Sequence, residues 1–315
     1  MNRFSLLFIT LCALSVPPMA AASDHDLEDA LNAQFEGKVV ILRHPMGNES
    51  LRYDAQGKSL DQGQEGDWTV YGAVRIQKIE LGKKQIRLQG TRLCVRSAAN
   101  GLAPFEFTRP KNPVLAPPVK PSVNVEIKTD QPPATVDQAQ ALLGNVFALN
   151  KDDLLDSVPE FWRTYLDAHL DDYDLKQGKE MQFNAEGSAK RSNSLAQRNT
   201  PPPSPSQESQ PPLGKIYQFG PNATDVDVKA PKVIFSPEPE FTEAARYEKF
   251  QGTLVLWLVV DQAGKVRKVG VVRPLGLGLD ESGVTRVKTW TFNPAMHDGK
   301  PVSVEMNMEV AFNLY

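Results

Sequence analysis

The sequence has little of what enzymes use for chemistry. It contains only two cysteines, and its four histidines are scattered, without the spacing of metal ligands. Acidic pairs such as Asp152–Asp153 lie in polar stretches, which is typical of solvated surface. No phosphate-binding glycine loop, nucleophile elbow or HExxH pattern occurs. The sequence therefore predicts a protein that is not an enzyme, with no catalytic residues, no metal site and no cofactor.

Excess charge of one sign is also missing. The chain has 35 basic and 38 acidic residues, so its formal net charge is −3. A nucleic-acid-binding protein usually carries a strongly basic face, and this balance gives no such signal. We therefore expect no nucleic-acid partner.

The chain has one apolar run near its start, and that run is short. Arg3 precedes the run Phe4–Val16, and Ala20 and Ala22 provide a small-residue cleavage pattern. About 20 apolar residues are needed to span a membrane, so a cleaved signal peptide over residues 1–22 is favoured. We expect export to the periplasm; the alternative is an inner-membrane anchor facing the periplasm. Cleavage would leave Cys94 as the only cysteine, expected to be a buried apolar residue without a disulfide partner.

Two folded units are expected after this segment, joined by a linker. Residues 23–170 predict a mostly antiparallel β unit with packed helices, and residues 171–214 predict a disordered, proline-rich linker. Residues 215–315 predict a C-terminal α+β domain, so the fold class is α+β. Because few apolar residues lie between the units, we expect them to behave independently. The expected helices of the first unit are at 24–35 and 135–149, followed over 154–166 by an amphipathic pair broken at Pro159. The expected strands are at 38–43, 50–53, 68–81, 85–96, 104–108 and 123–128, the last two forming a pair.

The C-terminal domain has the clearest pattern in the chain. Thr242 is the expected N-cap of a short helix, and Asp280 that of a second helix ending near Trp290. Strands are expected at 253–260 and 265–273, which gives two helices on a three-stranded sheet once the last strand is added. That last strand alternates with period two. Its predicted packed face carries Val302, Val304, Met306, Met308, Val310 and Phe312, and its predicted wet face carries Ser303, Glu305, Asn307, Glu309, Ala311 and Asn313.

Several motifs in these residues resemble the C-terminal domain of the TonB energy-transducer family. The matching features are Pro-x-Phe before Ala244 and Ala245, Gly252 before an apolar strand, Asp261-x-x-Gly264, Leu279-Asp280, Trp290-x-Phe292-x-Pro294-Ala295, and Asp298-Gly299-Lys300-Pro301 with Phe312. The resemblance covers about the last quarter of the chain. It implies a docking domain, associated with energy-dependent transport, that adds the extended TonB box of an outer-membrane receptor to its last strand. The implied partner-binding residues are the six of the wet face.

The resemblance does not extend to the other half of that mechanism. Anchored family members carry a histidine in their membrane helix and couple to an inner-membrane motor, and no histidine precedes His25 here. The alternative function is therefore an exported interaction protein that reuses the fold to bind another partner without a motor. A homodimer is a further expectation. Whether the N-terminal segment is retained or removed distinguishes the two functions.

Overall fold

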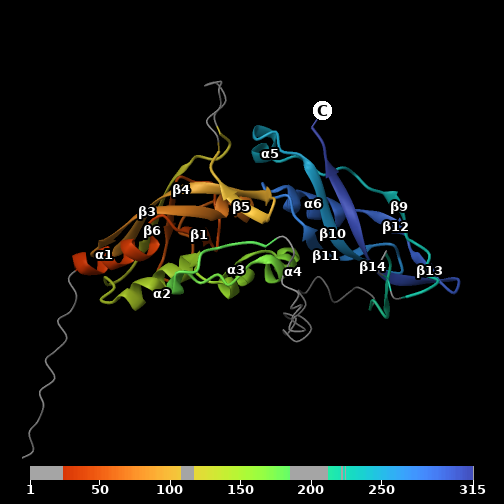
Figure 1. The fold of residues 1–315 in the computed structure, drawn as a ribbon, viewed down its shortest axis with the longest axis horizontal. Coiled ribbons are helices and arrows are strands. Elements are labelled where there is room, and N and C mark those ends of the chain that lie inside the picture. Colours follow the sequence, from red (N-terminus) through yellow and green to blue (C-terminus); the bar gives the residue numbers. More distant parts are fainter. Residues whose placement is uncertain (1–23, 108–116, 185–211, 221–222, 224, 315) are drawn as a thin grey trace, which may run out of the picture.

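The computed structural model describes residues 24–107, 117–184, 212–220, 223 and 225–314. It is an α+β structure in which an N-terminal unit and a C-terminal domain lie side by side (Figure 1). The expected signal peptide and the proline-rich tract at 201–211 lie outside the described residues. Within the described ranges, no helix is long and apolar enough to cross a membrane.

The N-terminal unit is built on one sheet with the strand order β2-β6-β4-β3-β1-β7, and β5 also pairs with β4. The pairing of β2 with β6 is parallel and the other pairings are antiparallel. Buried residues alternate along β2 and β6, as in strands with one side in the core, whereas successive residues of β1 and β7 are buried. The strands are β1 (Val39–Leu42), β2 (Ser50–Tyr53), β3 (Ala73–Gly82), β4 (Gln85–Ala98), β5 (Gly101–Phe105), β6 (Ser122–Lys128) and β7 (Phe147–Ala148).

Two predictions for this sheet are wrong. The strand expected at 68–81 begins only at Ala73, because Trp68–Gly72 forms a turn of π-helix, η1, whose side chains are mostly buried. The strands near 104–108 and 123–128 do not pair with each other; β5 and β6 each pair with β4 instead. The buried position of Cys94 on β4 agrees with the sequence.

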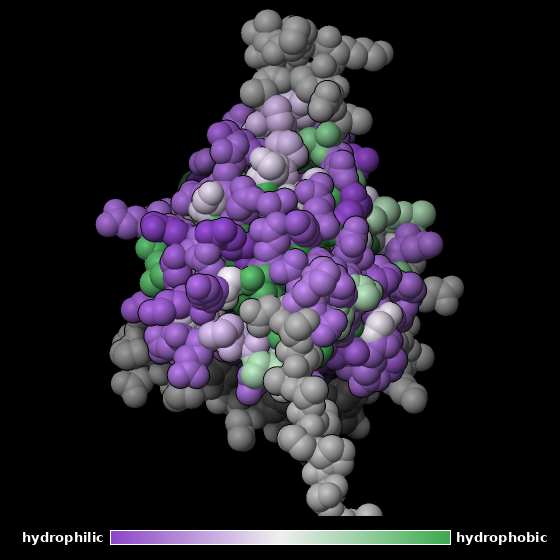
Figure 2. Space-filling model, turned by 90° about the vertical axis from the view of Figure 1, so that its left-hand side faces the viewer, coloured by the Kyte–Doolittle hydropathy of each residue, from purple (hydrophilic) through white to green (hydrophobic). Residues whose placement is uncertain are grey.

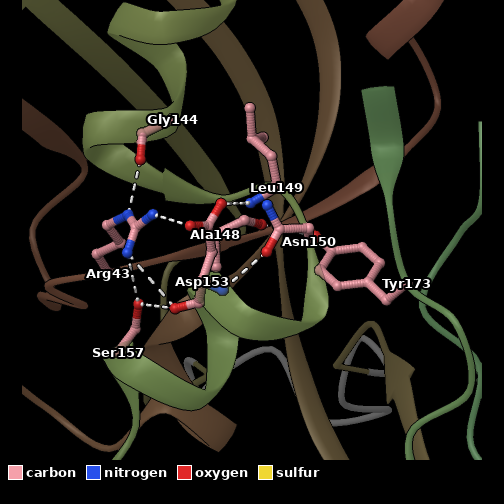
Figure 3. A network of polar contacts seen from close by, with 8 residues as sticks. All are labelled: Arg43, Gly144, Ala148, Leu149, Asn150, Asp153, Ser157 and Tyr173. Carbon is pink, nitrogen blue, oxygen red and sulfur yellow. Dashed lines mark hydrogen bonds and ion pairs between the residues drawn. The ribbon is translucent and has the colours of Figure 1, made fainter. Parts of the chain in front are cut away.

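Helices α2 (Val136–Val146), α3 (Lys151–Ser157) and α4 (Glu160–His169) run along one side of the sheet toward the C-terminal domain, and α1 (Asp24–Phe35) packs on β3 (Figure 1). A polar network holds α3 in place (Figure 3). Arg43 pairs with Asp153 at 2.6 Å and donates to the carbonyl of Gly144 at 2.7 Å. The side chain of Asn150 accepts from the N–H of Asp153 and caps α3. Because α4 follows α3 directly, the network also positions α4.

The segment after α4 is folded, which corrects the expected start of the linker at residue 171. Tyr173 is fully buried and donates to the carbonyl of Ala148 at 2.7 Å, and a short 3₁₀ helix, η2 (Leu175–Gln177), follows. The polar composition of 171–184 suggested disorder, but a few large side chains are enough to fix the segment on α3 and β7. Residues 185–211 lie outside the described part of the chain.

The C-terminal domain has the expected order of long elements and four additional short strands. Its sheet runs β11-β10-β14-β13, with β8 beside β14, and β9 and β12 form a separate pair. Thr242 caps α5 as expected, because its side chain accepts from the N–H of Ala245. The elements are β8 (Ile216–Gln218), β9 (Lys232–Phe235), α5 (Glu243–Tyr247), β10 (Gly252–Val260), β11 (Val266–Arg273), α6 (Leu279–Val287), β12 (Thr291–Asn293), β13 (Ala295–His297) and β14 (Lys300–Phe312).

Asp280 is not the N-cap of α6, which corrects a prediction for this domain. The helix begins at Leu279, and Gly278, in a left-handed conformation, holds the cap position. The Asp280 carboxylate is buried and accepts from the backbone N–H groups of Leu275 and Gly276. It therefore fixes the loop before the helix rather than the first turn of the helix.

That loop, residues 274–278, joins the two units. The N–H of Ser97 on β4 donates to the carbonyl of Leu275 at 2.8 Å, and the N–H of Leu277 donates to Val95 at 2.9 Å. Gly278 lies against η1, where its N–H donates to the hydroxyl of Thr69 at 2.9 Å. Backbone of the C-terminal domain thus pairs with backbone of the N-terminal sheet.

Side chains of α4 also contribute to the contact between the N-terminal unit and the C-terminal domain. Trp162 is fully buried, packs edge-on against Trp68 with 5.3 Å between ring centroids, and donates from Nε1 to Glu281 of α6 at 2.7 Å. Helix α4 also packs along β11, and one continuous core joins both units. The prediction that few contacts join the units is therefore wrong. The aromatic pattern indicated burial correctly, but the partner is largely the other domain.

The end of the molecule farthest from the C-terminal domain is mainly hydrophilic, with small separate hydrophobic areas (Figure 2). Among the described residues, most of the large hydrophobic side chains that are exposed belong to the C-terminal part of the chain. They are Phe219, Val226, Val233, Ile234, Phe235 and Val272, with Leu60 as the exception. Surfaces suited to a protein partner are thus concentrated on the C-terminal domain.

Candidate partner-binding edge

The long strand β14 forms one side of the main C-terminal sheet. It pairs along its inner side with β10, in a continuous register from Val304↔Val260 to Phe312↔Gly252. Its side chains alternate as the sequence predicts between Met306 and Phe312: Val310 and Phe312 are buried, and Met308 is partly buried. This apolar face packs on the core and holds the strand in position, so its outer edge is the part available to a partner.

The outer edge of β14 is covered only at its beginning. Lys300–Val302 pairs with β13 across the turn at Asp298 and Gly299, and Ser303–Glu305 pairs in parallel with β8. From Met306 to Phe312, no described strand pairs with this edge. Because an edge strand exposes backbone N–H and C=O groups, this stretch can accept a further strand.

The direction of the free backbone groups follows from one hydrogen bond. The N–H of Phe219, just after β8, donates to the carbonyl of Glu305 at 2.9 Å, so Glu305 turns its backbone groups outward. Successive residues of a strand point these groups to alternate sides. Asn307, Glu309 and Ala311 therefore also turn their N–H and C=O groups toward the open edge.

The six side chains that the sequence assigned to partner binding fall into two groups. Asn307, Glu309, Ala311 and Asn313 are exposed. Ser303 is fully buried and Glu305 is partly buried, because the segment containing β8 lies beside them. Ser303 donates from its hydroxyl to the carbonyl of Leu213 at 2.6 Å, so the expectation of a wet face is wrong for this residue.

Polar contacts within residues 215–225 shape the segment that contains β8. The N–H of Gln218 donates to Asp225 at 2.8 Å, and this hydrogen bond, together with Lys215 at 3.2 Å, lowers the pKa of Asp225. Lys215 also lies 4.0 Å above the ring of Tyr217, which packs on His297 of β13 with 4.7 Å between ring centroids. No sequence period marks β8, because the strand has only three residues.

The opposite side of the sheet offers less access. Strand β11 ends the sheet there, and α4 of the N-terminal unit packs along it. At Gly270, an added Cβ would lie 4.0 Å from the carbonyl oxygen of Phe161, so the helix approaches the strand closely. Strand addition is therefore favoured at β14 rather than at β11.

A group of carboxylates lies where the two units meet. Burial raises the pKa of Asp280 to about 7, and burial followed by the charges of Asp67 and Asp280 raises the pKa of Glu281. Burial also raises the pKa of Asp67. One Glu281 oxygen accepts from Trp162, while the other is buried without a hydrogen-bond partner in the described structure. We therefore expect the stability of the contact between the units to depend on pH.

Comparison with known proteins found similarity in the C-terminal part of the chain. Residues 237–314 match the family model described as Gram-negative bacterial TonB protein C-terminal. A solution NMR structure of the TonB C-terminal domain of Pseudomonas aeruginosa is similar at 17% sequence identity, over 29% of this chain and 90% of that one, with a TM-score of 0.24. No curated protein matches the chain.

Proposed function

We propose that the TonB C-terminal domain of this protein, residues 237–314, captures an extended segment of an outer-membrane receptor as an added strand on the outer edge of β14. The family is a non-catalytic family of energy transducers, and its C-terminal domains interact with outer-membrane receptors. The partner is accordingly a receptor segment that is extended before it binds. The protein acts in transport across the cell envelope and faces the periplasm.

One observation carries this proposal: β14 has backbone hydrogen-bonding groups on its open side at Asn307, Glu309 and Ala311. Backbone pairing supplies affinity in strand addition, and neighbouring side chains supply selectivity. The exposed side chains of the same three residues lie beside half-buried Thr253, Val255 and Trp257 of β10, which are their register partners. An added strand would contact the exposed side chains while pairing with the backbone.

A backbone substitution tests the proposal more directly than a side-chain substitution. Asn307→Pro removes an outward N–H but leaves the pairing of β14 with β10 intact, and proline is tolerated at an outward position of an edge strand. Asn307→Ala keeps the N–H and is the matched control. We expect Asn307→Pro to weaken binding of peptides from receptor plug N-termini about tenfold, equivalent to about 1.4 kcal/mol, and Asn307→Ala to bind nearly as wild type.

The assay is fluorescence anisotropy of labelled peptide with the full-length chain, with circular dichroism to confirm that the proline variant is folded. Equal affinities for a folded Asn307→Pro and for wild type would show that binding does not use this edge. Binding of none of the receptor peptides by wild type would contradict the proposal and favour an interaction protein with another partner.

The N-terminal segment decides how far the energy-transducing role extends. A retained segment 1–22 would place the protein at the inner membrane, where coupling to a motor is possible; a removed one would leave a periplasmic protein that docks without a motor. Mass spectrometry of the mature N-terminus distinguishes the two. Neither result changes the proposed role of β14.

A further inference from the structure

The open edge of β14 is continuous with a stretch that this chain already occupies. Strand β8 runs parallel to β14 beside Ser303–Glu305, and the chain leaves the edge after Phe219, next to the free stretch 307–311. A partner strand that pairs along the whole outer edge must use the positions held by β8. The two strands would then compete for the same backbone groups.

The contacts that hold β8 are suited to release. The strand has three residues, and neither Ile216 nor Tyr217 is fully buried. In the part of the chain that the structure describes, the segment is held to β14 by few hydrogen bonds beyond the strand pairing: the hydroxyl of Ser303 donates to the carbonyl of Leu213, and the N–H of Phe219 donates to the carbonyl of Glu305. The ion pair between Lys215 and Asp225 lies within the segment and need not break when β8 leaves. By contrast, the inner side of β14 is held by nine residue pairs with β10, so β14 can stay in place when β8 leaves.

We infer that β8 is an internal competitor: a displaceable strand of this chain that occupies Ser303–Glu305 and lowers the affinity of β14 for an extended receptor segment. This inference rests on the proposed function of the edge. It adds that binding is regulated in cis by the segment around residues 213–219, which follows the proline-rich part of the chain. Anything that pulls or binds that segment would free the edge.

The contact between β8 and β14 also indicates which partner strand fits beside Ser303–Glu305. Tyr217 is in register with Val304 and packs its ring on His297, so the place beside His297 accepts an aromatic side chain. A receptor segment that takes the direction and register of β8 runs parallel to β14 and places one residue in the position of Tyr217. The partner class is thus an extended parallel segment with a large planar or apolar residue at that position.

A matched pair of substitutions at one position tests the competition. Phe219→Pro removes the N–H that donates to Glu305 and should release β8, whereas Phe219→Ala keeps that N–H and removes only a ring that is 38% exposed. Apparent affinity falls with the fraction of competent molecules, so if nine of ten molecules hold β8 in place, release raises affinity about tenfold. We expect Phe219→Pro to bind receptor-plug peptides about tenfold more tightly than wild type, and Phe219→Ala to bind as wild type.

A second probe does not depend on the receptor. A labelled peptide with the sequence of residues 212–220 should bind the full-length Phe219→Pro chain and bind wild type at least several-fold more weakly. The proposed competition would be overturned if wild type binds a receptor peptide and Phe219→Pro binds the same peptide with equal or lower affinity. If no receptor peptide binds either chain, the proposed function fails. The 212–220 peptide then decides by itself whether β8 can be displaced. Binding of this peptide to Phe219→Pro would support displacement, and the absence of binding would overturn it.

Discussion

The contact between the two units can be tested at Gly276, which lies against β4. Gly276 has φ +82, and a Cβ there would stand 2.2 Å from the carbonyl oxygen of Val95 and 2.6 Å from Cα of Arg96. Both are backbone atoms, so neither can rotate away. Gly276→Ala should therefore push the loop off β4 and break the hydrogen bonds made by Leu275 and Leu277.

The expected cost has three parts. An alanine in the left-handed region costs about 1–2 kcal/mol, overpacking costs about 1–3 kcal/mol, and each lost hydrogen bond costs about 0.5–1.5 kcal/mol. These parts overlap, because a loop that moves away relieves the clash as it breaks the bonds. We expect the free energy of unfolding to fall by about 3–5 kcal/mol.

Gly299→Ala is the matched control. Gly299 has φ +75 in the turn before β14, and nothing lies within 4 Å of the added Cβ, so this variant carries the backbone strain alone. Its expected cost is about 1–2 kcal/mol. Urea unfolding of the full-length chain, followed by circular dichroism and by tryptophan fluorescence, measures both variants. We expect one transition for wild type and Gly299→Ala and two for Gly276→Ala; equal costs and a single transition for both variants would refute the account of the interface.

Two further predictions concern buried side chains. Trp290 is buried and donates from Nε1 to the carbonyl of Pro237 at 3.1 Å, so Trp290→Ala should cost about 3–5 kcal/mol, and an unchanged melting temperature would place the ring outside the core. Because the pKa values of Asp280 and Glu281 are raised in the folded protein, their protonated forms stabilise it. This contribution to the free energy of unfolding is complete below about pH 4, where the same carboxyls are also protonated in the unfolded chain. For Asp280, it is lost as the pH rises through about 7. Glu281→Gln cannot ionise, so urea unfolding between pH 4.5 and 7.5 should show a smaller loss of stability than in wild type; an identical loss would contradict the direction of the Glu281 shift.

The sequence predicted most long elements because their period is local. In β14, apolar and polar residues alternate from Val302 to Val310, and Thr242 caps α5 through a neighbour three residues away. Trp68–Gly72 misled the same reasoning, since its large apolar residues also suit a strand although they form a π-helix. Asp280 misled it because the carboxylate accepts from Leu275 and Gly276 of the preceding loop and not from the first turn of the helix.

What the sequence could not show depends on contacts between distant parts of the chain. The aromatic residues near Trp162 indicated burial, but a burial pattern does not identify the partner, which here is α6 of the other unit. Strand β8 has three residues and pairs with residues 303–305, far along the chain, so no local signal marks it. The exposure predicted for Asn307 and Glu309 agrees with the structure, while Ser303 is buried beside the segment that contains Leu213 and β8. Partner binding by any of these residues stays a prediction.

Amide protection along β14 tests the central claim most directly. In the free protein, the amides of Met308 and Val310 face β10 and should exchange slowly, while those of Asn307, Glu309 and Ala311 face the open edge and should exchange quickly. Hydrogen exchange followed by NMR of the full-length chain would be recorded with and without a saturating receptor-plug peptide. Strand addition predicts that the three outward amides become protected and that Met308 and Val310 change little. Saturation of the chain by such a peptide with no added protection at residues 307, 309 and 311 would contradict the account.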